Sequence, residues 1–163
     1  MVVLRCTRPL LARLRPAKDF ASEPSTTRLG DWYGTLTRFG RRQVLIFISE
    51  RSRLPVLLPA GDATRLHDAL LIAIADALTV VGIPETAIDR ERMLMSEMRL
   101  GRAQDRSLIG SLNEFARLGR AHLEVTPNDP LNVVGRELAD VPLILPFKGD
   151  CARAVTRRVF GLD

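Results

Sequence analysis

Apolar runs separated by turn residues indicate a β-meander in the first part of the chain. Residues Trp32–Phe39 and Val44–Ile48 have strand composition and flank an arginine-containing turn at 40–42. The second of these runs shows no polar alternation, which indicates a central strand covered on both faces. Leu54–Leu58 is expected as a third strand, at the sheet edge because the prolines in and beside it donate no backbone hydrogen bond. A short β-rich run at Val2–Cys6 precedes the meander.

Helical spacing of apolar residues dominates the rest of the chain. A long helix is expected over Ala63–Val81, capped by Asp62 and ended by Gly82. A shorter helix over residues 84–93 follows it, and residues 94–103 have the composition of a further strand. The polar positions of the long helix fall on one narrow stripe, so we expect its other faces to pack against the sheet.

The segment Ser107–Glu124 is an amphipathic helix that begins after the polar residues 105–107. Its apolar positions, which we expect to be buried, are Leu108, Leu112, Phe115, Gly119 and Leu123. Further helices are expected after Thr7 and Asp150, which can cap a helix start, and one opened by Asp129 and Pro130.

These elements together predict an α+β protein. The expected sheet is mainly antiparallel, consisting of the meander with the N-terminal and central strands. The long helix and further C-terminal helices cover it. With 163 residues, 46% of them apolar, the chain can bury one core, so we expect residues 1–163 to form a single domain.

Arginine carries the positive charge of the chain. There are 24 lysine and arginine residues against 19 acidic ones, and the only lysines are Lys18 and Lys148. An arginine excess suits recognition of phosphate or carboxylate, because the planar guanidinium offers these groups two parallel hydrogen bonds. A genome rich in G and C produces the same excess without any function, and the sequence leaves both explanations open.

The sequence gives little support to metal, cofactor or membrane chemistry. Cys6 and Cys151 lie far apart without metal-ligand spacing, which fits a reducing cytoplasm. Glu85, Asp89 and Glu91 have the spacing of ordinary helix ion pairs with arginine. The glycine-rich phosphate loops of common nucleotide-binding proteins are missing, so we expect no cofactor. No apolar stretch is long enough to span a bilayer and the N-terminus has no leader-like apolar core, so we expect a cytoplasmic protein without a membrane partner.

Four stretches of the chain resemble an uncharacterised bacterial family of unknown function. They are LRCTRPLLARL, STTRLGDWYGTL, RSLIGSLNEF and ADVPLILPF, in this order from the N-terminus. The resemblance covers nearly the whole chain and implies one small cytosolic α+β domain. It implies no particular activity, cofactor or catalytic residue.

The start of the amphipathic helix is the first candidate binding site. Arg102 and Arg106 stand beside it, and Ser107 offers a hydroxyl. Asn113 lies on the outer side of the same helix. Free backbone N–H groups and the positive end of the helix dipole suit an anion at this position. The alternative is that Asp105 and the serine only cap the helix.

The loop before the meander is the second candidate. Ser25–Arg28 supplies hydroxyls and the guanidinium of Arg28, and Trp32 or Tyr33 offers an aromatic wall. If the fold brings this loop to the helix start, these residues form a phosphate pocket. The alternative is that the hydroxyls only stabilise a turn.

Arginines also gather at the hairpin turn and along the helix. Arg38, Arg41 and Arg42 lie beside aromatic residues, an arrangement that can hold single-stranded RNA through phosphate contacts and base stacking. Arg117 and Arg120 share one helix face, which is either a phosphate-binding ridge or a solvated surface. We expect the helix start to bind anions more strongly than the hairpin, because hairpin side chains must lose conformational freedom on binding.

Three functions follow from these candidates. The first is a small module that binds RNA, DNA or a phosphate-bearing small molecule through arginines. An alternative is a toxin-type ribonuclease, or another enzyme acting on a phosphorylated substrate, with Arg106, Ser107 and His67 as its candidate residues. The third is a protein-interaction module. It is indicated by Ile72 in the polar stripe of the long helix and by the proline-flanked run Val141–Phe147, which is either core or a docking strip.

Overall fold

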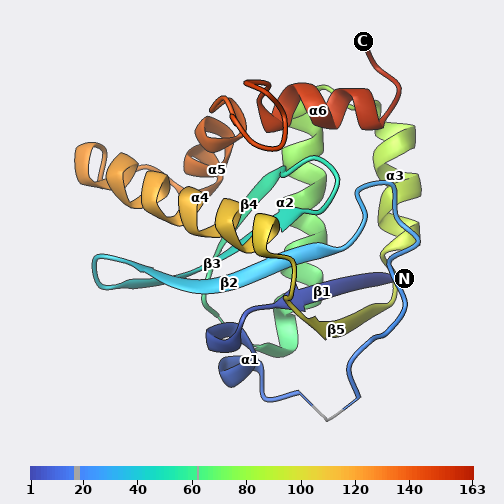
Figure 1. Ribbon diagram of the computed structural model, residues 1–163, viewed down its shortest axis with the longest axis horizontal. Helices are drawn as coiled ribbons and strands as arrows, with labels where there is room; N and C mark the ends of the chain where they lie inside the picture. The colour runs from blue at the N-terminus through green and yellow to red at the C-terminus, as the bar shows by residue number, and fades with distance from the viewer. Residues whose placement is uncertain (17–18, 62) are drawn as a thin grey trace.

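The computed structural model describes residues 1–16, 19–61 and 63–163, which form a five-stranded sheet with helices on both faces (Figure 1). The strands are β1 (Val2–Cys6), β2 (Trp32–Phe39), β3 (Arg42–Ser49), β4 (Pro55–Pro59) and β5 (Met98–Arg102). The helices are α1 (Arg8–Leu14), α2 (Leu66–Val81), α3 (Glu85–Leu94), α4 (Arg106–Val125), α5 (Leu131–Ala139) and α6 (Ala152–Val159). None of these helices combines the length and the apolar character that crossing a membrane requires.

The strands lie in the order β4-β3-β2-β1-β5. The meander β2–β4 is antiparallel, and β4 forms one edge as its prolines predict. By contrast, β1 runs parallel to both of its neighbours, β2 and β5. A parallel pair needs a crossover between its strands, and α1 with the loop after it connects β1 to β2. The α+β class is therefore confirmed, with a mixed, mostly antiparallel sheet.

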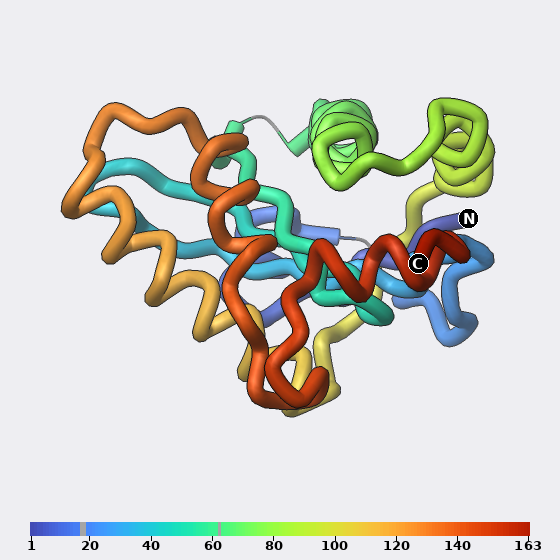
Figure 2. The backbone as a smooth tube through the Cα atoms, turned by 90° about the horizontal axis from the view of Figure 1, so that it is seen from above, coloured from blue at the N-terminus to red at the C-terminus, as the bar shows by residue number. Residues whose placement is uncertain are grey.

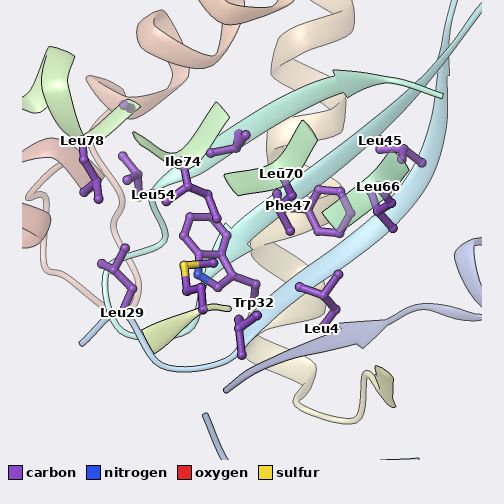
Figure 3. Packing of buried hydrophobic residues seen from close by; sticks show 14 of the residues in the cluster. Leu4, Leu29, Trp32, Leu45, Phe47, Leu54, Leu66, Leu70, Ile74 and Leu78 are labelled. Carbon is purple, nitrogen blue, oxygen red and sulfur yellow. The ribbon is translucent and has the colours of Figure 1, made fainter. Parts of the chain in front are cut away.

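A separate apolar core lies on each face of the sheet. α2 covers one face, and α4 and α5 cover the other (Figures 1 and 2). Trp32 and Phe47 point towards α2 and pack with Leu70 (Figure 3). Successive strand residues face opposite sides, so Tyr33 belongs to the other core with Phe115 of α4.

Helix starts test the capping predictions. Asp105 caps α4 as predicted, because its carboxylate accepts a hydrogen bond from the Leu108 amide at 2.9 Å. The prediction for Asp150 is wrong. α6 begins after Cys151, and the Asp150 carboxylate pairs with Arg158.

Two other starts differ from the simplest capping pattern. Thr7 occupies the cap position of α1, yet its hydroxyl donates to the Thr35 hydroxyl at 2.7 Å and ties the helix start to β2. The predicted cap of the long helix, Asp62, lies outside the described residues. That helix opens with a 3-10 turn, Ala63–Arg65, before α2 begins.

The proline-flanked run at 141–147 divides between core and surface. Leu143 is buried in the core beneath α4 and α5, and Phe147 packs partly against it. Ile144 and Leu145 are exposed. The backbone of this run turns instead of extending, so it forms neither a complete core segment nor a continuous strip.

Candidate functional site

The turn between β3 and β4 holds an arginine against the start of α4. Arg53 has a φ of 58°, in the left-handed region that L residues rarely adopt, and it is 6% exposed. Its guanidinium donates to the Glu50 carbonyl at 2.7 Å and to the Ser107 hydroxyl at 3.2 Å. Its Nε is buried and has no hydrogen-bond partner in the described part of the chain. Trp32 Nε1, in the core on the other face of the sheet, is likewise buried without a partner among the described residues, and each such donor has an energetic cost.

A buried chain of hydroxyls fixes the backbone of this turn. The Ser49 hydroxyl donates to the Leu29 carbonyl at 3.1 Å and accepts from the Ser52 amide at 3.0 Å. The Ser52 hydroxyl accepts in turn from Thr156 of α6 at 2.9 Å. Because these groups are buried, each bond lost leaves an unsatisfied polar atom, so the turn is held firmly.

The first turn of α4 adds donors and positive charge to the same place. The amides of Arg106 and Ser107 have no acceptor within the helix, since the first amides of any helix lack one. The Arg106 side chain is exposed there, and the exposed Arg102 guanidinium lies 4.7 Å from the centre of the Phe20 ring. Asp105 opposes anion binding because it places a carboxylate at the helix start.

Acidic groups around the turn are already committed to protein donors. The Asp31 carboxylate accepts from Arg5 Nε at 2.6 Å and from the Ser25 amide at 2.7 Å. A Glu50 carboxylate oxygen accepts from the Asp31 amide at 3.0 Å. Gly101 leaves room for the Arg5 side chain, since a Cβ at this position would lie 2.8 Å from its Nη1. These interactions fix the loop before β2 and leave the Arg53 guanidinium facing α4.

Tyr33 is the aromatic residue of the site. It is 7% exposed, and burial together with the negative charges of Glu50 and Asp105 raises the pKa of its phenol. Burial lowers the pKa of the Arg53 guanidinium, while Asp105 and Glu50 act in the opposite direction. A guanidinium remains protonated in proteins at neutral pH, so the site presents a fixed positive charge beside a neutral phenol.

The structure brings together three of the predicted site residues and separates the others. Arg106 and Ser107 lie at the start of α4, and Tyr33 lies near Arg53. Arg102 ends β5, and its guanidinium packs on the Phe20 ring. Asn113 lies further along α4, on its exposed side.

The other two predicted residues point elsewhere. Trp32 is fully buried on the α2 face, so it cannot wall a pocket near α4. The Arg28 guanidinium lies 5.8 Å from the centre of the Phe160 ring, beyond α6. The hydroxyls of Ser25 and Thr26 bond to the first residues of the chain and not within a turn, whereas the Thr27 hydroxyl donates to the Gly30 carbonyl at 2.8 Å, as the turn interpretation expects. The predicted pocket between this loop and the helix start is therefore not assembled.

His67 does not join Arg106 and Ser107 in a catalytic group. It belongs to α2, on the opposite face of the sheet from α4 (Figure 1). Its Nε2 lies 2.8 Å from the Met95 carbonyl, which gives this half-buried ring a structural partner. The ribonuclease built on these three residues is consequently not supported by their positions.

The hairpin arginines and the helix ridge form one surface. Arg120 Nε donates to the Arg38 carbonyl at 3.4 Å, so the distal part of α4 lies on the β2–β3 hairpin. Gly119 permits this approach, because a Cβ there would lie 2.9 Å from the Phe39 ring. Arg41 at the hairpin tip is exposed, whereas Arg117 pairs with Glu114 on its own helix.

Sequence reasoning missed the residues that organise the site. Arg5 carries a usable signal, since it faces away from the apolar side of its strand. No local pattern marks Arg53. Glu91 is a correction: it makes no ordinary helix ion pair, because its buried carboxylate accepts from the amides of Arg28 and Leu29, both at 3.0 Å.

Comparison with known proteins identifies a family without an assigned activity. The catalytic core domain of the HTLV-2 integrase, in a trimeric form with magnesium, has 13% identity and a TM-score of 0.44, with 76% of this chain and 93% of that chain covered. A chain of the simian T-cell lymphotropic virus intasome in complex with the PP2A regulatory subunit B56 gamma has 10% identity and a TM-score of 0.44, with 76% and 54% covered. No curated protein matches the sequence significantly. Residues 3–153 match the family described as "Domain of unknown function (DUF6933)", and the chain therefore belongs to this family.

Proposed function

We propose that this protein is a non-catalytic module that binds the phosphate groups of a nucleic acid through arginine. The single observation that carries the proposal is the buried Arg53 guanidinium, which is bonded to Ser107 and holds a fixed positive charge behind the exposed first turn of α4. Guanidinium donors held in place by the protein bind a phosphate at little entropic cost, because their side chain is already ordered.

The arrangement of the other arginines favours a strand over a single phosphate. From Arg106 to Arg120 the helix rises roughly 21 Å, at about 1.5 Å per residue. Arg120 contacts the hairpin that carries Arg38 and Arg41. A ligand that reaches both ends of α4 therefore carries several phosphates, as RNA and DNA do and inorganic phosphate does not.

Binding of labelled oligonucleotides at two salt concentrations tests this proposal. Affinity for a twelve-nucleotide RNA or DNA should fall as salt rises, since phosphate contacts release counterions. Arg106→Ala should weaken binding about tenfold, and Ser107→Ala should weaken it by a smaller factor. Arg90→Ala, which removes an exposed arginine from α3, is the matched control and should leave affinity unchanged.

The same assay distinguishes the alternatives. Competition by millimolar inorganic phosphate without any preference for the oligonucleotide would show that the ligand is a small anion. Absence of retention at low salt, or equal losses in the Arg106 and Arg90 variants, would reject the proposal.

A further inference from the structure

An apolar groove of about 630 Å³ runs along the edge of the sheet, away from the start of α4. β4 forms its floor, and α2 and α5 form its walls. Its volume lies within the range of protein ligand sites, roughly 300 to 1,000 Å³. In Figure 2, α2 and α5 lie on opposite sides of the sheet at this edge.

The wall made by α2 combines a smooth stripe with an apolar rim. Ala69, Ala73 and Ala77 recur every four residues and therefore share one helix face, where they line the groove. Ile72 and Val80 stand at the rim and are 59% and 44% exposed. Large exposed apolar residues beside an apolar recess indicate a surface that another molecule covers.

The edge of β4 is unsuited to receive another strand. Leu54 and Ala60 bond to β3, so the alternating residues Pro55, Leu57 and Pro59 direct their backbone outward. Proline has no N–H, which leaves the Leu57 amide as the one outward donor of this strand. Strand addition depends on a row of such donors, whereas a helix satisfies its own backbone.

Charges around the groove favour an acidic occupant. Arg42 and Arg136 are exposed on its lining and form no ion pair within the described residues. Arg153 also lines the groove, but Asp140 neutralises it. Asp76 is the one acidic residue among the described lining residues, so the rim carries a net positive charge.

We propose that this groove binds an acidic amphipathic helix of a partner protein. Its apolar side would lie between α2 and α5, and its carboxylates would face Arg42 and Arg136. Ile72 and Val80 are eight residues apart on α2, about 12 Å at 1.5 Å per residue, so roughly two turns of partner helix cover the rim. This inference is independent of the nucleic-acid proposal, because the two surfaces share neither Arg53 nor the start of α4.

A matched pair of peptides tests the proposed occupant. The first is a twelve-residue labelled helix with leucine on one face and glutamate on the other, and the second carries lysine in place of glutamate. Fluorescence anisotropy should show saturable binding of the glutamate peptide, about tenfold tighter than the lysine peptide. Amide NMR shifts should locate it at Ala73 and Gly135.

Surface variants then locate the contact. Ile72→Glu and Arg136→Glu alter exposed side chains and should each weaken the glutamate peptide about fivefold or more. Val125→Glu introduces the same charge at an apolar residue that is 83% exposed on α4, and it should have no effect.

Three results would overturn the proposal. The first is no saturable binding of the glutamate peptide up to about 1 mM. The second is equal affinity for both peptides, or an equal loss in the Val125 variant. The third is a dimer in sedimentation that Ile72→Glu dissociates, because the occupant would then be a second copy of this chain.

Discussion

The two turns of the meander have similar backbone geometry and opposite surroundings. The β2–β3 hairpin turns at Gly40, with a φ of 60°, and no atom lies within 4 Å of the place where a Cβ would stand. The β3–β4 turn contains Arg53, with a φ of 58°, and its side chain is buried. Glycine adopts this conformation at no steric cost, whereas arginine needs compensating contacts.

The difference shows which arginines the fold has ordered. Arg41 stands exposed at the hairpin tip and must lose side-chain freedom before it binds anything. Arg53 has already lost that freedom, because Glu50 and Ser107 hold its guanidinium. The density of arginine is similar in the two turns, so charge alone does not distinguish them.

Removing the charge that fixes the loop before β2, beside the second turn, should have the largest effect. Asp31→Asn leaves the Arg5 guanidinium without its carboxylate, and we expect a loss of about 3 kcal/mol in the free energy of unfolding. Urea unfolding measures this loss. Glu97→Gln breaks the exposed pair with Arg99 and should change stability by less than about 0.5 kcal/mol. Similar effects of the two variants would show that the Arg5–Asp31 pair does not fix the loop before β2.

Substitutions in the two turns separate the cost of backbone strain from the contribution of side-chain contacts. Arg53→Ala keeps the left-handed backbone and removes two hydrogen bonds, so we expect a loss of about 2 kcal/mol. Arg53→Gly removes the same bonds but also the strain, and should be about 1 kcal/mol more stable than the alanine variant. Gly40→Ala should cost about 1 kcal/mol from strain alone. If Arg53→Gly is no more stable than Arg53→Ala, the strain argument is wrong.

Anion binding should depend on the fixed backbone amides at the start of α4 more than on the number of arginines. Arg106→Ala removes one cation from the start of α4 and should weaken oligonucleotide binding about tenfold. The double variant Arg41→Ala/Arg42→Ala removes two exposed cations and should weaken it less, about threefold. A larger loss of affinity in the double variant would show that the binding site lies at the hairpin.

The smallest expected effect is a change in the pKa of Tyr33, the single tyrosine, which titration measures. Burial, Glu50 and Asp105 raise the pKa of Tyr33, so its absorbance near 295 nm should change at higher pH in the folded protein than in urea. The neutral phenol is favoured by folding, and the associated stability is therefore lost as the pH rises above about 10. Glu50→Gln should lower the titration midpoint, and Arg41→Ala should leave it unchanged. Identical midpoints in all proteins would contradict the described surroundings of Tyr33.

Local patterns predicted the elements but not the tertiary neighbours of the site. The edge position of β4 could be predicted because the sequence shows its prolines, and proline has no N–H to donate to a neighbouring strand. Asp105 caps α4 through a contact three residues away, which a short window also contains. The sequence does not distinguish Trp32 from Tyr33 as the aromatic wall of the predicted phosphate pocket. Successive strand residues face opposite sides of the sheet, but the sequence does not show which side α4 covers.

The features that could not be predicted from the sequence depend on contacts between segments that are far apart in the chain. Arg53 meets Ser107 across 54 residues, and Glu91 meets Leu29 across 62. Neither pair leaves a trace in local composition or spacing. The parallel pairing of β1 escaped prediction for the same reason, since strand order depends on which non-local pairs form.

The position of β1 imposes an order on the folding of the chain. The meander pairs residues that are close in sequence and can form early, because short loops close quickly. β1 precedes the other four strands in the sequence, yet one of its two edges has no partner until β5 has been synthesised. During synthesis this edge of β1 therefore stays exposed until the whole meander, α2 and α3 have been made, and the sheet is complete only after the first and last of its strands have met.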